Sequence, residues 1–123
     1  MDVSRSQSWQ ISEAADGAIC AKFIGPTPTD EVAPFLTALV AIMPESNARL
    51  VFDLRELGGY NSETKEPMKA WLLTHKLAIQ ELTVLVPKSG AMLKMVVAAM
   101  ALATGVKIRV REDLEALASF AAP

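Results

Sequence analysis

The sequence has only one cysteine, Cys20, and only one histidine, His75, among its 123 residues. A single cysteine cannot form an intrachain disulfide, so nothing in the composition requires an oxidising compartment. A single histidine excludes a metal site built from several imidazoles, and it would have to be the base of any serine hydrolase triad. Because Cys20 lies in a strand-like run, we expect a small buried hydrophobe rather than a reactive thiol.

The sequence also lacks a long apolar run and a block of basic residues. Its longest apolar stretch, AMLKMVVAAMALA, is interrupted by Lys94 and is shorter than the ~20 residues that a membrane-spanning helix needs. The first residues, MDVSRSQSWQ, do not contain the apolar core of a signal peptide. The formal net charge is −2 and charges are dispersed, so we expect no nucleic-acid surface. These features predict a cytoplasmic protein without a transmembrane segment.

The length predicts a single domain over residues 1–123. A domain of this size buries roughly two-thirds of the surface that its unfolded chain exposes, which is enough for a core without disulfides or metal. Hydrophobic residues make up 51% of the sequence, slightly more than is usual for a soluble protein. Core, subunit interface and apolar pocket can each account for this excess.

The hydrophobic pattern predicts an α/β fold. Two strand-like runs, Trp9–Glu13 and residues 18–24, flank Asp16-Gly17, a dipeptide that favours a tight hairpin turn. Strand-like and helical runs then alternate, which indicates right-handed crossovers and a mostly parallel sheet behind the hairpin. We expect about five strands and about four helices, with further strands at 50–54, 82–86 and 106–110 and helices at about 32–43, 64–78, 89–105 and 113–120.

Three stretches in this order carry a family resemblance: LVFDLREL from residue 50, ELTVLV from residue 81 and VKIRVREDLEAL from residue 106. Together with Trp71 and His75, they resemble the STAS superfamily, which comprises sulfate-transporter and anti-sigma-factor-antagonist domains. The sequence looks closest to the SpoIIAA-like branch, which is also similar to Sec14-like lipid-binding domains. The resemblance covers nearly the whole chain. It implies a non-enzymatic regulatory or protein-interaction module, a homodimer with a regulatory protein partner.

In the anti-sigma-factor antagonists, a strand similar to VFDL leads to Asp-Ser-Ser-Gly, and a partner kinase phosphorylates the second serine. Setting the aspartate of that strand on Asp53 places Asn61, Ser62 and Glu63 against Asp-Ser-Ser, and Thr64 against the glycine. The resemblance therefore implies a partner-binding rim at residues 61–64. Glu63 cannot accept a phosphate and carries a fixed charge that only partly imitates one. A phosphorylation switch would have to use the hydroxyls of Ser62 or Thr64.

The same residues also have a structural interpretation. Asp53 lies near the end of a predicted parallel strand, where open α/β sheets usually bind ligands. A buried carboxylate can equally accept hydrogen bonds from loop N–H groups and hold a turn. Asn61, Ser62 and Thr64 are all good helix N-caps. We favour the structural role for Asp53 and the capping role for the others.

Two predicted helices suggest an alternative function. Trp71 and His75 lie on one face of the helix at about 64–78. The helix at about 89–105 is apolar almost all round, so neighbouring helices, a dimer partner or a ligand must cover it. We favour the core or a homodimer interface. The alternative is a small apolar or lipid-like ligand bound between Trp71, His75 and Met95.

No motif predicts catalysis, a cofactor or a metal. The sequence contains no Walker motif, paired-cysteine site or HExxH. The candidate nucleophiles Ser62, Ser89 and Cys20 have no base at a recognisable spacing, so we expect no enzyme. Lys88 and Ser89 precede a predicted helix and are a candidate anion contact, although a solvated turn explains them as well.

Overall fold

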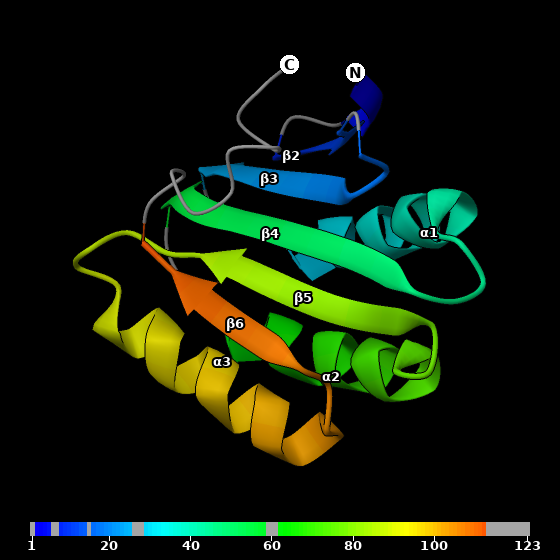
Figure 1. The fold of residues 1–123 in the computed structure, drawn as a ribbon. Coiled ribbons are helices and arrows are strands. Elements are labelled where there is room, and N and C mark those ends of the chain that lie inside the picture. The colour runs from blue at the N-terminus through cyan, green and yellow to red at the C-terminus, as the bar shows by residue number, and fades with distance from the viewer. Residues whose placement is uncertain (1, 6–7, 15, 26–28, 59–61, 113–123) are drawn as a thin grey trace.

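A computed structural model of the protein describes residues 2–5, 8–14, 16–25, 29–58 and 62–112. These residues form a six-stranded sheet in which the strand order follows the sequence (Figure 1). The strands are β1 Asp2–Arg5, β2 Trp9–Glu13, β3 Ile19–Gly25, β4 Ala48–Leu57, β5 Ile79–Leu85 and β6 Ile108–Arg111; the α-helices are α1 Val32–Ile42, α2 Lys65–His75 and α3 Ala91–Thr104; and the 3₁₀ turns are η1 Thr29–Glu31 and η2 Ser62–Thr64.

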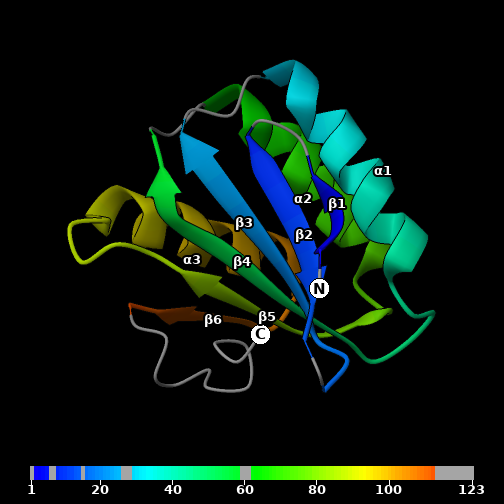
Figure 2. The ribbon, with the colours of Figure 1, turned by 90° about the horizontal axis from the view of Figure 1, so that it is seen from above.

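The sheet changes from antiparallel to parallel at β3. The pairs β1–β2 and β2–β3 are antiparallel, whereas β3–β4, β4–β5 and β5–β6 are parallel. Right-handed crossovers between neighbouring parallel strands place each connecting helix on the same face of the sheet. Figures 1 and 2 show α1, α2 and α3 together on one side, and α2 contacts both of the other helices. The described elements thus form two layers.

The predicted α/β class is confirmed, including the leading antiparallel hairpin and the mostly parallel sheet. The sheet has one more strand than the roughly five we expected, because β1 was not predicted. Its sequence, DVSR, is too short and too polar to show the alternation that marks a strand. The fourth helix, predicted at residues 113–120, lies outside the described residues.

The hairpin between β2 and β3 turns at Gly17. Its φ of +88° lies in the left-handed region, which glycine adopts without a steric penalty. The Asp16 carboxylate accepts a hydrogen bond from the Ala18 N–H at 3.1 Å, and the Ala14 N–H donates to the Ala18 carbonyl at 2.8 Å. The predicted Asp16-Gly17 turn is therefore confirmed.

Four aromatic residues join α1 to the sheet. Phe35 of α1 lies edge-on to Trp9, Phe23 and Phe52, with ring centroids 5.6, 4.9 and 5.8 Å away. These separations are typical of favourable edge-to-face pairs. All four residues belong to the buried core cluster, so Phe35 fixes the position of α1 on the sheet.

The centre of β4 is buried on both faces. Leu50 and Phe52 belong to the core under the helices, and Val51 and Asp53 alternate with them and are also buried. This burial confirms the interior strand predicted from the apolar run at 50–54.

A β-bulge interrupts β4 next to β3. Two steps along β3, from Lys22 to Ile24, correspond to three steps along β4, from Asp53 to Glu56. The extra residue in β4 shifts the alternation of its side chains. As a result, two hydrophobic residues three positions apart both pack against the core on the helix side: Leu54 and Leu57.

The aromatic cluster gives a stability prediction. Replacing Phe35→Ala should lower the free energy of unfolding by about 3–5 kcal/mol, because it leaves a cavity between three aromatic rings. Val40→Ala is the matched control on the same helix, since Val40 is 40% exposed, and it should change stability by about 0.5 kcal/mol or less. Urea denaturation measures both, and similar losses would contradict the role of Phe35.

Candidate functional site

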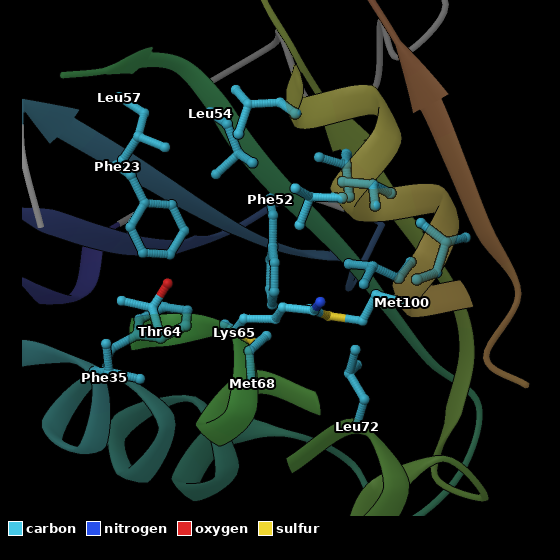
Figure 3. Close-up of a pocket in the computed structure, with 17 residues that line it drawn as sticks. Phe23, Phe35, Phe52, Leu54, Leu57, Thr64, Lys65, Met68, Leu72 and Met100 are labelled. Carbon is cyan, nitrogen blue, oxygen red and sulfur yellow. The ribbon is translucent and has the colours of Figure 1, made fainter. Parts of the chain in front are cut away.

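A cavity of about 130 Å³ lies between the helix side of the sheet and the helices (Figure 3). Strands β3, β4, β5 and β6 and helices α1, α2 and α3 all contribute to its lining. Its buried wall includes Phe23, Phe35, Phe52, Leu72, Val84 and Met100.

The cavity is almost wholly apolar. Seventeen described residues line it, and all of these except Thr64 and Lys65 are hydrophobic. Both polar residues come from the start of α2, so the polar groups are confined to one side of the cavity. Such a lining cannot hydrogen-bond a water molecule in the interior, and an apolar ligand would be favoured there.

The cavity is partly open to solvent, and side-chain exposure marks the open side. Partly exposed residues of the described lining occur on β4 (Leu54, Leu57), α2 (Thr64, Met68), α3 (Leu93, Val96, Val97) and β6 (Ile108). Among the lining residues that the structure describes, Lys65 alone is exposed. The mouth of the cavity therefore includes the start of α2, where Lys65 lies.

The volume limits the ligand. An engineered apolar cavity of about 150 Å³ in another protein binds benzene or xenon, whereas sites for drug-sized ligands measure about 300–1,000 Å³. At about 130 Å³ the cavity fits a single ring or a short chain. A whole phospholipid does not fit this volume.

Asp53 lies on the other face of the sheet, since its side chain alternates with those of Phe52 and Leu54. Its carboxylate accepts three hydrogen bonds from Arg55: from the backbone N–H at 3.1 Å, from Nε at 2.9 Å and from Nη2 at 2.8 Å. Burial raises the pKa of Asp53, but the hydrogen bonds from Arg55 outweigh burial and hold the pKa below its ordinary value. Asp53 is therefore an ionised structural residue.

The structural role predicted for Asp53 is correct, but its partner is different. Loop N–H groups were the expected donors, whereas the guanidinium and N–H of Arg55 bind the carboxylate. Residues two apart on a strand share a face, so the sequence FDLREL contained this signal. Such a paired carboxylate is not available as a general acid at neutral pH.

Cys20 is partly exposed on β3, next to β4. Burial raises the pKa of its thiol to about 11, and the nearby charge of Asp53 adds to the effect. The nucleophilic form of cysteine is the thiolate, which is scarce at neutral pH when the pKa is so high. This agrees with the expectation of an unreactive thiol.

Of the predicted rim at residues 61–64, the described residues Glu63 and Thr64 lie beside the cavity mouth. Asn61 and the side chain of Ser62 are outside the described residues, and Glu63 is exposed. Thr64 holds the N-cap position of α2 but makes no side-chain capping hydrogen bond, so its predicted capping role is wrong. Thr64 instead lines the cavity together with Lys65, a role that the sequence did not reveal.

The residues predicted to hold a ligand lie away from the cavity. The rings of Trp71 and His75 are 5.0 Å apart, and Trp71 is part of the core, but neither residue lines the cavity. Met95 is 73% exposed on the outer side of α3. Helices α2 and α3 do contribute to the lining, but through other residues: Met68, Leu72, Leu93, Val96, Val97 and Met100.

The candidate anion contact lies in the turn between β5 and α3. Lys88 and Ser89 are both exposed. Gly90, not Ser89, holds the N-cap position, and α3 begins at Ala91. Anion binding by Lys88 and Ser89 stays a prediction.

The described ranges offer neither a cluster of metal ligands nor a membrane-spanning helix. Within them, no group of three or more His, Cys, Asp or Glu side chains is placed to hold a metal ion. In the same part of the chain, no helix combines the length and the apolar character needed to cross a bilayer.

The structure resembles that of a known protein. No family model matches the sequence, and no curated protein matches it. The fold is similar to the crystal structure of an uncharacterized protein of the DUF3478 family from Shewanella loihica PV-4, described as having a SpoIIAA-like fold. The TM-score is 0.66 at 14% identity, over 96% of this chain and 98% of the other. The chain thus has a SpoIIAA-like α/β fold, as the resemblance implied, and at this identity the likeness shows the fold alone.

The Asp53–Arg55 pair predicts a pH dependence of stability. The pKa of Asp53 is lower in the folded state, so its ionised form stabilises the fold above the unfolded pKa of about 3.9. This contribution is lost as the pH falls through the lowered pKa. The difference in unfolding free energy between the wild type and Asp53→Asn should stay constant from about pH 7 to 5 and shrink below about pH 4.

Urea denaturation across this pH range measures the difference. Glu45→Gln, at an exposed position, is the control and should show no comparable change. A difference for Asp53→Asn that grew on acidification would contradict the stabilising pair.

Proposed function

We propose that the protein is a non-enzymatic binding domain that takes a small apolar ligand into the cavity between its sheet and helices. The observation that carries the proposal is the cavity itself, with about 130 Å³ of space and a described lining that is hydrophobic except at Thr64 and Lys65. Transfer of an apolar ligand from water into such a space is favourable, because it removes apolar surface from water on both sides.

The chemistry of the lining supports a role without catalysis. The described lining contains no carboxylate, imidazole or thiol, the groups that most often transfer protons or attack substrates. Asp53 and Cys20, which lie on the strands that line the cavity, project from the other face of the sheet. Binding is therefore the function that this lining suits.

The regulatory role implied by the family resemblance fits the same site. Glu63 lies on the surface next to Thr64, which lines the cavity. A ligand at the mouth would contact the start of α2, and its presence would change the surface that the rim offers to a partner protein. In this proposal the ligand controls the rim in place of a phosphate group.

Filling the cavity tests the proposal. Benzene should raise the Tm of the wild type, since a ligand that binds the folded state alone stabilises it. Val97→Phe places a ring in the cavity and should abolish this response. It should lower the free energy of unfolding by about 1.5 kcal/mol or less, because the ring enters space that is already empty.

Met95→Phe is the matched control, because it adds a ring of the same size on the exposed side of the same helix. It should respond to benzene as the wild type does. A wild type without any response, to benzene or to xenon, would contradict the proposal.

A second candidate function is self-association through α3. Its outer face exposes Met92, Met95 and Leu102 by 66%, 73% and 88%. Together with Ala99 they are spaced i, i+3, i+7 and i+10. This is the spacing of the apolar residues that form the contact seam between two paired helices. The seam carries no charge, so two copies related by a two-fold axis can pack it against itself. This supports the predicted homodimer.

Light scattering on a sizing column tests the dimer. We expect a dimeric wild type and a monomeric Met95→Glu, because the new charge would be buried in the interface. Leu77→Glu is the control, since Leu77 is 92% exposed but lies outside α3, and it should remain dimeric. A monomeric wild type at high concentration would exclude the interface.

A further inference from the structure

Lys65 is a cation at the mouth of an apolar cavity. It is the first residue of α2, it is exposed, and it belongs to the cavity lining. Figure 3 shows its side chain extending across the other lining residues rather than away from them. The aliphatic part of a lysine can lie along apolar surface while its ammonium stays in contact with water. The charge is therefore placed where a bound ligand would leave the cavity.

The lining contains no described charge that would neutralise Lys65. Within the described part of the chain, no acidic side chain lines the cavity, and the side chain of Lys65 makes neither a hydrogen bond nor an ion pair. Glu63 and Glu66 are its neighbours in sequence, but neither contributes to the lining. Among the described lysines, Lys22 and Lys94 are paired with Glu56 and Glu112, whereas Lys65 is not.

From this arrangement we propose that the ligand is an amphipathic carboxylate, whose apolar ring or short chain fills the cavity and whose carboxylate binds the ammonium of Lys65. This inference rests on the proposed function and specifies its ligand class. The cavity volume limits the apolar part to about one ring. A single lysine, with no arginine in the described lining, suits a singly charged carboxylate better than a phosphate, which is usually held by several donors.

Three probes of the same shape test the charge preference. They are 3-phenylpropionate, 3-phenylpropan-1-ol and 3-phenylpropylammonium, and calorimetry or NMR titration measures their Kd. The carboxylate should bind the wild type about two- to fivefold more tightly than the alcohol, because an exposed ion pair is a modest interaction. The ammonium probe should bind most weakly. Added salt should reduce these differences, since the pair is open to solvent.

Substitutions of Lys65 test whether its ammonium causes the preference for the carboxylate probe. Lys65→Met should bind the carboxylate and the alcohol equally, and Lys65→Glu should favour the ammonium probe. Lys69→Met is the matched control: it removes the same charge one turn along α2, at a residue outside the lining, and should retain the preference for the carboxylate. Circular dichroism should show an unchanged fold, since an acidic residue is tolerated in the first turn of a helix.

The outcomes separate this inference from the proposed function. If the alcohol and benzene bind but the carboxylate binds no more tightly, the carboxylate assignment is wrong and the apolar site stands. If Lys69→Met loses the preference as fully as Lys65→Met does, the effect is one of overall charge and Lys65 is not the contact. If neither benzene nor any probe binds, both proposals fail together.

Discussion

The handedness of the connections between parallel strands determines where this protein can hold a ligand. Strands β3, β4, β5 and β6 are neighbours in sequence order, so right-handed crossovers bring every connecting helix to one face. In many open α/β sheets the helices divide between the two faces, and the crevice where they divide is the usual binding site. A sheet with this strand order has no such crevice. The space for a ligand lies instead under the helices, within the apolar layer.

The two faces of β4 consequently have different chemistry. On the helix side, Phe52 contributes both to the aromatic cluster around Phe35 and to the wall of the cavity, so the aromatic core supports the site. On the other side, Asp53 and Arg55 satisfy each other through charge-assisted hydrogen bonds. The charged pair and the apolar cavity thus lie on opposite faces of the same strand, and the pair does not take part in the cavity lining.

The sequence was sufficient for the fold but only partly for the site. Strong alternation and the Asp16-Gly17 turn predicted the hairpin, and the apolar run at 50–54 predicted the interior strand. On α2, however, one apolar stripe contains both the predicted Trp71 and the observed Leu72, and periodicity cannot tell which part of a wide buried arc lines a cavity. The nearly uniform apolar character of α3 likewise hid the fact that Met95 points outward and Val97 inward. Cavities arise from the spacing between elements, which no single element encodes.

The bulge in β4 has a consequence for the comparison of this chain with its relatives. Because of the extra residue, Leu54 and Leu57 turn toward the same layer although an odd number of positions separates them. A homologue that lacks the extra residue would keep the strand, but its counterpart of Leu57 would point to the opposite face of the sheet. The cavity would then lack one of its lining side chains. Among proteins of this fold, the number of residues between the positions equivalent to Asp53 and Leu57 therefore distinguishes chains that can share this lining from those that cannot.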